Sequence, residues 1–313
     1  MVTRRKQKSP RRLEAEKHDQ IGIEHYNAGR YAETEIAWRA AAAADPGWDE
    51  PPFSLGVLYK WQGRWSEALA SSRHALALNP QNQGALWNTG IAATALRDWQ
   101  AARAAWTGYG IELLPGEGEI RAFAITTPIR LDADSGEEVV WTRRIDPARA
   151  VITSVPLPES GRRHGDIVLH DGEPKGERML GERTVAVFNM LGLWRASREI
   201  TFRCRVYAHG AHDSAVLERM LGRAGCASED MSNIRMLCRQ CSEGLVHEQH
   251  DHDRPDPRWN PNRRLLIATR SPKRLRLALK QWARREATRE VVSLRQDLPR
   301  LPRQVARRLP VKK

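Results

Sequence analysis

The sequence predicts a multidomain protein with an N-terminal all-α solenoid of three helix-turn-helix repeats, an α+β domain, and a basic C-terminal tail that is helical or disordered. Three observations predict it. Glycines recur every 34 residues in the first third of the chain, and the hydrophobic period becomes alternating after Arg121. Residues 263–313 then hold 17 Lys or Arg against three acidic residues. A chain of 313 residues also has the length of two folded units.

The charge is concentrated at the two ends. The formal net charge is +13, but residues 1–12 carry +6 and residues 263–313 carry +14, so residues 13–262 are net −7. A nucleic-acid or membrane role should therefore be separable from the body of the chain. We expect these parts: a basic arm (1–12), the repeat region (13–117), the α+β domain (118–246), a His/Asp/Pro-rich linker (247–262) and the basic tail (263–313).

Composition excludes several classes of protein. Hydrophobic residues are 41% and charged residues 28%, which is ordinary for a globular chain and argues against wholesale disorder. No apolar run approaches the roughly 18 residues of a membrane-spanning helix. The basic start continues into charged sequence, so we expect no secretory signal there. Four cysteines without such a signal predict reduced thiols and a cytoplasmic protein.

The repeat region is defined by columns of residues 34 positions apart, each with a role in a pair of antiparallel helices. A small residue is needed where the two helices approach closely, an aromatic side chain fills the remaining space, and a proline ends the second helix. The columns are Gly22, Gly56 and Gly90; Trp38, Ser72 and Trp106; and Pro46 and Pro80.

These columns resemble the tetratricopeptide (TPR) repeat, which has the same 34-residue period. The middle copy, with Gly56, Tyr59, Gly63, Ala68 and Pro80, matches its pattern best. The resemblance implies a right-handed superhelix whose first helices line a concave groove for a peptide or protein segment. The groove positions that it implies are Ile23, Tyr26, Phe53, Val57, Lys60, Trp61, Trp87, Asn88 and Ile91.

Some TPR proteins grip the carboxylate terminus of a chaperone with a clamp of lysine and asparagine. Those positions hold Asp19, Ile23, Ser54, Gly84 and Asn88 here, so the clamp is essentially absent. An apolar groove leaves two interpretations open. It is a site for an apolar or helical peptide, or other parts of the chain cover it.

The middle domain is β-rich and ends in a strand–helix–strand pattern. We expect strands at 122–125, 139–141, 150–155, 166–169, 184–188, 200–207 and 234–237, and a helix at 213–223. Turns are expected between them, including His170-Asp-Gly172 and Lys175-Gly176. The pattern predicts an α+β domain with a ferredoxin-like half.

The same domain contains the residue types of a hydrolase triad in Ser160, His164 and Asp166. They lack a nucleophile elbow between a strand and a helix, and adjacency in a loop does not produce a catalytic geometry. Polar turns are the favoured interpretation. An enzyme with its site in the α+β domain stays the third functional hypothesis, and the first expectation is a protein that is not an enzyme.

A cysteine–histidine cluster is the clearest metal-like motif. Cys238 and Cys241 are separated by two residues, and His247 and His250 could complete a tetrahedral structural zinc site, with Cys226 as an alternative ligand. Two reduced thiols beside a solvated linker explain the pattern as well. A redox dithiol is less favoured, because it needs the start of a helix.

The basic tail contains a predicted amphipathic helix. Ser271-Pro272 is a good helix start, and an apolar stripe follows at Leu275, Ala278, Leu279 and Trp282. Such a helix can bind nucleic acid, lie on an anionic membrane, dock in a groove or remain a solvated tail. The candidate residues for nucleic acid or another anion are Arg264, Lys273, Arg274, Arg276, Lys280, Arg284 and Arg285.

These patterns favour a cytoplasmic adaptor that binds a peptide or protein segment in the groove of the repeats. The second hypothesis is a protein that associates with nucleic acid, without sequence preference, through residues 263–313. The sequence predicts no certain cofactor; zinc is the one candidate.

Overall fold

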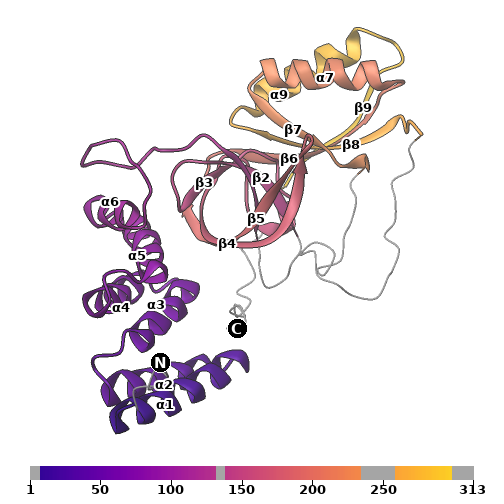
Figure 1. Cartoon of the computed structure of the whole chain (residues 1–313). Helices are drawn as coiled ribbons and strands as arrows, with labels where there is room; N and C mark the ends of the chain where they lie inside the picture. The colour runs from indigo at the N-terminus through magenta and orange to yellow at the C-terminus, as the bar shows by residue number, and fades with distance from the viewer. Residues whose placement is uncertain (1–7, 132–137, 234–257, 298–313) are drawn as a thin grey trace. The chain divides into compact units, whose positions relative to one another are not determined.

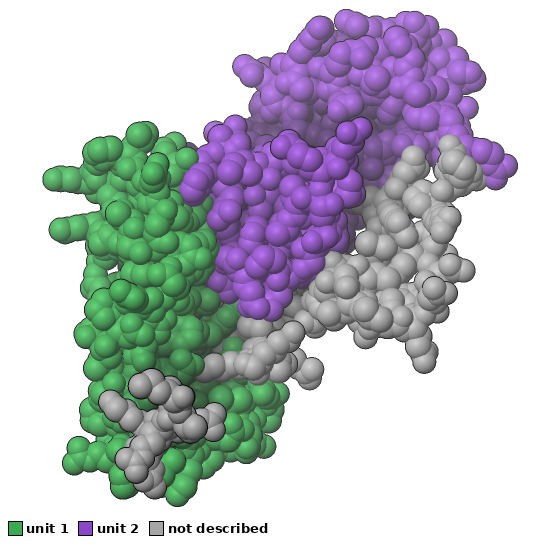
Figure 2. All heavy atoms as spheres, in the orientation of Figure 1, with its two compact units in different colours: residues 1–122, 146–148, 305–313 green, residues 123–145, 149–304 purple. Residues whose placement is uncertain are grey.

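The chain forms two compact units in its computed structural model, which describes residues 8–131, 138–233 and 258–297. Figure 2 colours the two units separately. Among the described residues, the first contains 8–122 and 146–148, and the second contains 123–131, 138–145, 149–233 and 258–297.

The first unit is built from three antiparallel helical hairpins (Figure 1). Within each hairpin the two helices pack on each other, and contacts of α2 with α3, α4 with α5 and α3 with α5 stack the hairpins. This confirms the predicted helical repeats. The helices are α1 (Pro10–Asn27), α2 (Tyr31–Ala44), α3 (Glu50–Gln62), α4 (Trp65–Leu78), α5 (Gln83–Leu96) and α6 (Trp99–Gly108).

The first glycine column marks the point where the two helices of a hairpin come closest. A Cβ atom on Gly22 would lie 2.4 Å from the Trp38 ring, and a Cβ on Gly90 would lie 2.6 Å from the Trp106 ring. In the middle copy the same position, Gly56, faces the hydroxyl of Ser72 at 2.6 Å. A side chain at Gly22 or Gly90 would force the helices apart, so these glycines set the packing distance of their hairpins.

The turn between the helices of each hairpin requires a left-handed residue. Gly29 and Gly63 have φ of 74° and 71° at the first two turns, which glycine adopts without steric cost. Arg97 takes the same conformation, with φ of 63°, at the third turn. The turn geometry is therefore kept where the glycine is lost.

The second unit begins with a closed five-stranded barrel of β1 (Thr126–Arg130), β2 (Val139–Arg144), β3 (Arg149–Ile152), β4 (Ile167–Leu180) and β5 (Arg183–Arg195). Successive strands are antiparallel, and β1 closes the barrel by pairing in parallel with β5. The one-turn helix η1 (Pro158–Ser160) lies between β3 and β4. The barrel core contains Ile129, Leu131, Val140, Ala150, Ile152, Val168 and Met190.

Two details of the barrel differ from the sequence prediction. The first strand begins at Thr126, after the predicted segment 122–125. The predicted turns at His170-Asp-Gly172 and Lys175-Gly176 lie inside β4, where the pairing with β5 shifts register between His170 and Glu177. Glycines at these places accompany bulges in a long hairpin rather than chain reversals.

A second sheet follows the barrel, with the strand order β7-β8-β6-β9. Strands and helices alternate as β-α-β-β-α-β along the chain, which is the ferredoxin-like arrangement. Figure 1 shows both helices on the same face of this sheet. The elements are β6 (Ile200–Tyr207), α7 (Ala211–Arg223), β7 (Cys226–Asp230), η2 (Met231–Asn233), β8 (Asn262–Thr269), α9 (Pro272–Arg284) and β9 (Glu290–Gln296).

The structure thus corrects the domain boundary expected at residue 263. β8 lies between β7 and β6, and β9 pairs with the other edge of β6. The apolar stripe of α9 packs with Phe202, Leu217 and Ile267 in one core, and the indole N–H of Trp282 donates to the Asp213 carbonyl at 3.0 Å. Residues 262–296 are an integral part of the fold. The expected strand 234–237 and most of the expected linker lie outside the described residues.

We predict that Gly90→Ala destabilises the first unit by about 1–3 kcal/mol, since the new methyl group overlaps the buried Trp106 ring. Gly56→Ala should cost less, because the Ser72 hydroxyl can rotate away. Urea unfolding followed by circular dichroism measures both. Gly222→Ala is the control, since a Cβ there meets no atom within 4 Å. A Gly90→Ala protein as stable as the parent would contradict the packing argument.

We predict that Trp282→Ala destabilises the second unit by about 3–5 kcal/mol, because it leaves a large cavity under α9. Leu277→Ala on the same helix should change stability by less than about 0.5 kcal/mol, since Leu277 is 54% exposed. Thermal unfolding of the full chain compares the two. If both variants lose little and equal stability, α9 is a solvated helix and does not pack on the sheet.

Candidate functional site

The predicted groove positions lie on the first helix of each hairpin. Five of them are buried in the chain: Tyr26 on α1, Lys60 and Trp61 on α3, and Asn88 and Ile91 on α5. The other four are partly exposed: Ile23, Phe53, Val57 and Trp87. The surface open to a partner is therefore narrower than the nine positions that the resemblance implied.

Several groove positions also hold the first unit together. Trp87 packs edge-on against Trp106 and Tyr109, with ring centroids 5.0 and 4.8 Å apart, and so fixes α5 on α6. Phe53 fills the space beside Gly84, where a Cβ would lie 2.6 Å from its ring. Substituting either residue would disturb the packing of the hairpins as well as any ligand contact.

The charged position of the groove is equally constrained. Lys60 is buried, and its ammonium group lies 5.6 Å from the centre of the Trp61 ring. It also interacts with other groups of the chain. Ile23 and Val57 remain as partly exposed aliphatic side chains on α1 and α3. This surface suits apolar side chains of a partner. Its chemistry does not suit a terminal carboxylate, because Asp19 adds a negative charge where the clamp would need a donor.

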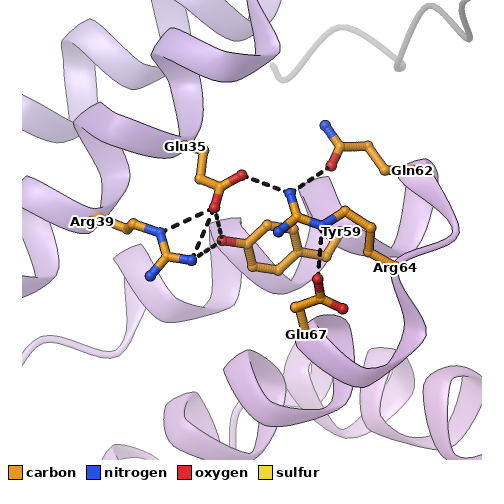
Figure 3. Close-up of polar contacts among 6 residues, drawn as sticks. All are labelled: Glu35, Arg39, Tyr59, Gln62, Arg64 and Glu67. Atoms are coloured by element: carbon orange, nitrogen blue, oxygen red, sulfur yellow. Dashed lines mark hydrogen bonds and ion pairs between the residues drawn. The ribbon is translucent and has the colours of Figure 1, made fainter.

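A polar network joins the first two hairpins, and sequence reasoning missed it (Figure 3). The Glu35 carboxylate on α2 accepts hydrogen bonds from Arg39 at 2.9 Å, from the Tyr59 hydroxyl at 2.8 Å and from Arg64 at 2.7 Å. The Arg64 guanidinium also lies over the Tyr59 ring, 4.3 Å from its centre. Arg64 additionally bonds Gln62 and Glu67.

The network shifts the pKa values of its members in opposite directions. Burial alone would raise the pKa of Glu35, but the hydrogen bonds from Arg64, Tyr59 and Arg39 outweigh it and lower the pKa to about 2. Burial and the hydrogen bond to Glu35 raise the pKa of Tyr59 to about 12. The ionised carboxylate and the neutral phenol are thus the states that stabilise this hairpin contact.

The predicted zinc ligands Cys238, Cys241, His247 and His250 lie outside the described residues, so the metal site stays a prediction. Within 8–131, 138–233 and 258–297, no group of three or more His, Cys, Asp or Glu residues could hold a metal ion. The alternative ligand, Cys226, is a buried thiol in the core beneath α7 and α9.

The residues of the possible hydrolase triad are engaged separately. The Ser160 hydroxyl donates to the Leu157 carbonyl at 2.7 Å, whereas His164 Nδ1 lies 2.7 Å from a Glu199 carboxylate oxygen. Asp166 accepts backbone N–H bonds from Arg163 and Ser197. The bonds of Ser160 with Leu157 and of Arg163 with Asp166 close local turns, whereas Glu199 and Ser197 tie the segment to the residues just before β6. An enzymatic role for this segment remains a hypothesis without added support.

One shallow pocket lies beside these turns. It is lined by Pro158, Gly161, Arg162, Arg163, Ile200, Thr201, Gln296 and Asp297. Near it, burial raises the pKa of Glu138 to about 7, against an accepted hydrogen bond from the Leu157 N–H. No sequence pattern pointed to this carboxyl, since its partners come from a different segment.

The predicted anion-binding residues are all exposed. Arg264 lies on β8, and Lys273, Arg274, Arg276, Lys280 and Arg284 lie on α9, which Arg285 ends. They belong to a folded element rather than to a tail. None of the helices in the described part of the chain has the length and apolar character to cross a membrane.

Comparisons with known proteins concern only parts of the chain. No family model matches it, and a search of curated proteins finds no match. The first TPR domain of Spaghetti (RPAP3), bound to an HSP90 peptide, is 21% identical, with 31% of this chain and 78% of that chain covered and a TM-score of 0.30. The TPR2B domain of yeast Sti1 in its pHsp70 complex is 15% identical, with 31% and 78% covered and a TM-score of 0.30. A hypothetical protein from Neisseria gonorrhoeae is 15% identical, with 55% and 94% covered and a TM-score of 0.26.

We predict that Glu35→Gln removes about 1–3 kcal/mol of stability at neutral pH, because hydrogen bonds to a charged carboxylate are lost. In the parent this contribution is complete above pH 4.5, the ordinary pKa of the group, and is lost as pH falls toward 2. The variant should lack this component of the pH dependence. Urea unfolding at several pH values measures it, with the exposed Glu33→Gln as the control. Parallel pH curves for the parent and Glu35→Gln would contradict the assignment.

Proposed function

We propose that the protein is an adaptor that binds a peptide or protein segment on the first helices of its helical unit. The observation that carries the proposal is a stack of three hairpins with partly exposed apolar side chains on α1, α3 and α5. Stacked helical repeats form extended surfaces of this kind, and an amphipathic segment can lay its apolar face on them.

The chemistry of the surface defines the class of ligand. Ile23, Val57 and Phe53 offer apolar contacts, and the clamp positions on α1, α3 and α5 hold no lysine. The proposed ligand is therefore an internal, apolar segment rather than a free acidic C-terminus. Because Lys60, Trp61 and Asn88 are buried, they would support the surface rather than touch the ligand first.

Val57 and Ile23 are the sharpest positions for a test, because their substitution disturbs less packing than that of Phe53 or Trp87. Peptides selected by the full chain from a displayed library would be measured by fluorescence anisotropy. We predict that Val57→Arg or Ile23→Arg weakens their binding by about tenfold or more, since a charge placed against an apolar ligand costs about 1–3 kcal/mol.

The matched control is Ile36→Arg on α2. Ile36 is 69% exposed and lies on the second helix of its hairpin, outside the proposed surface. This variant should bind the selected peptides as the parent does. If the Val57 and Ile23 variants keep full affinity while remaining folded, the ligand binds elsewhere and the proposed site is wrong.

A further inference from the structure

The outer face of α9 carries a row of cations that form no ion pair with the described part of the chain. Its exposed basic residues are Lys273, Arg274, Arg276, Lys280 and Arg284, with Arg285 at the C-cap, and the helix contains no acidic residue. Across residues 8–131, 138–233 and 258–297, no carboxylate forms an ion pair with any of these six. Neighbouring arginines differ: Arg289 is paired with Asp213 at 2.7 Å, and Arg263 with Asp230 at 2.6 Å.

The spacing brings four of these charges, Lys273, Arg276, Lys280 and Arg284, together on one side of the helix, while Arg274 and Arg285 lie toward one edge of the buried face. At 3.6 residues per turn, Lys273, Lys280 and Arg284 point within about 40° of one another. Arg276, Lys280 and Arg284 are successive i,i+4 neighbours, so like charges face each other along the row. The row extends for about 16 Å at 1.5 Å per residue.

The cations at the start of α9 are also repelled by the positive end of the helix dipole. Lys273 and Arg274 lie in the first turn, where the helix macrodipole is positive and no acidic residue balances it. The Ser271 hydroxyl caps the Arg274 N–H at 3.4 Å, but it carries no charge. The free protein therefore holds a charge arrangement that works against its own helix, and an anionic partner would relieve it.

The opposite face of α9 restricts the kind of partner. Leu275, Ala278, Leu279 and Trp282 are buried against the sheet, so the helix has no apolar face to insert into a bilayer. Leu277 is an isolated apolar residue among the cations. A partner for this face must offer a regular row of negative charges rather than a hydrophobic surface.

We propose that the outer face of α9 binds the phosphate backbone of double-stranded nucleic acid without reading its sequence. Duplex DNA carries one charge per about 1.7 Å of its axis, so phosphates are available along the whole row of cations. Long, flexible Lys and Arg side chains can reach them without a fixed register. This site is independent of the peptide surface on the first unit.

The test uses the full chain and a fluorescently labelled DNA duplex of about 20 base pairs, with anisotropy recorded over a series of salt concentrations. The variant K273Q/K280Q/R284Q removes three charges from the row. The expected result is a loss of affinity of tenfold or more at low salt. The slope of log K against log[salt] should fall by about 2–3, since each phosphate contact contributes about 0.9.

The control R143Q/R183Q/R198Q removes three exposed cations that lie outside α7 and α9, so it changes the net charge equally. It should keep most of the affinity and the slope. Because the helix variant removes repulsion, its Tm should stay equal or rise, which separates lost binding from lost folding. Unchanged DNA binding by the folded helix variant, equal losses in both variants, or tighter binding of polyglutamate than of DNA would overturn the proposal.

Discussion

The close approach of paired helices is the constraint on which the first unit depends. At Gly22, Gly56 and Gly90 the second helix leaves no room for a Cβ atom, and the opposing residue always lies 16 positions later in the chain. Two of the three opposing residues are buried tryptophans, so a small residue on one helix and a large one on the other fix the same distance. The partly exposed surface of α1, α3 and α5 is a consequence of that distance, because it sets how the first helices follow one another.

In the second unit, α9 has its buried apolar residues on one face and its cations outside that face. The residues that bury the helix are four apolar side chains on one face, and all of its cations lie elsewhere. Burial of large apolar side chains contributes kilocalories per residue, whereas exposed like charges cost tenths. Packing therefore determines where the helix lies, and the charge remains on the surface. Of the 17 Lys and Arg residues in 263–313, six lie on α9 or at its C-cap, and six belong to residues 298–313.

Elements with local signals could be predicted from the sequence, whereas long-range pairing could not. Helical hairpins could be predicted because their signals, glycine columns and breaking prolines, are local and repeated. β6 could be predicted at residues 200–207 because its alternation is strict, with Phe202 and Cys204 inside and Arg203 and Arg205 outside. The position of β8 in the sheet could not be predicted. Residues 263–313 are so basic that they resemble a tail, and the order of strands depends on pairing between distant segments. The Glu35 network was equally inaccessible, since Tyr59 and Arg64 come from the next hairpin.

The candidate functional surfaces are those where the packed chain keeps exposed apolar side chains or neighbouring like charges. Most side chains at the groove positions pack within the first unit. Trp87 contacts Trp106, Phe53 lies against Gly84, and Lys60 is buried. Ile23 and Val57 keep apolar surface in water, and α9 keeps a row of like charges. Neither feature helps the isolated chain to fold. An apolar partner would cover the first surface, and an anionic partner would neutralise the second. The two surfaces lie in separate units and differ in kind, so an adaptor with one protein ligand and one nucleic-acid ligand is consistent with both.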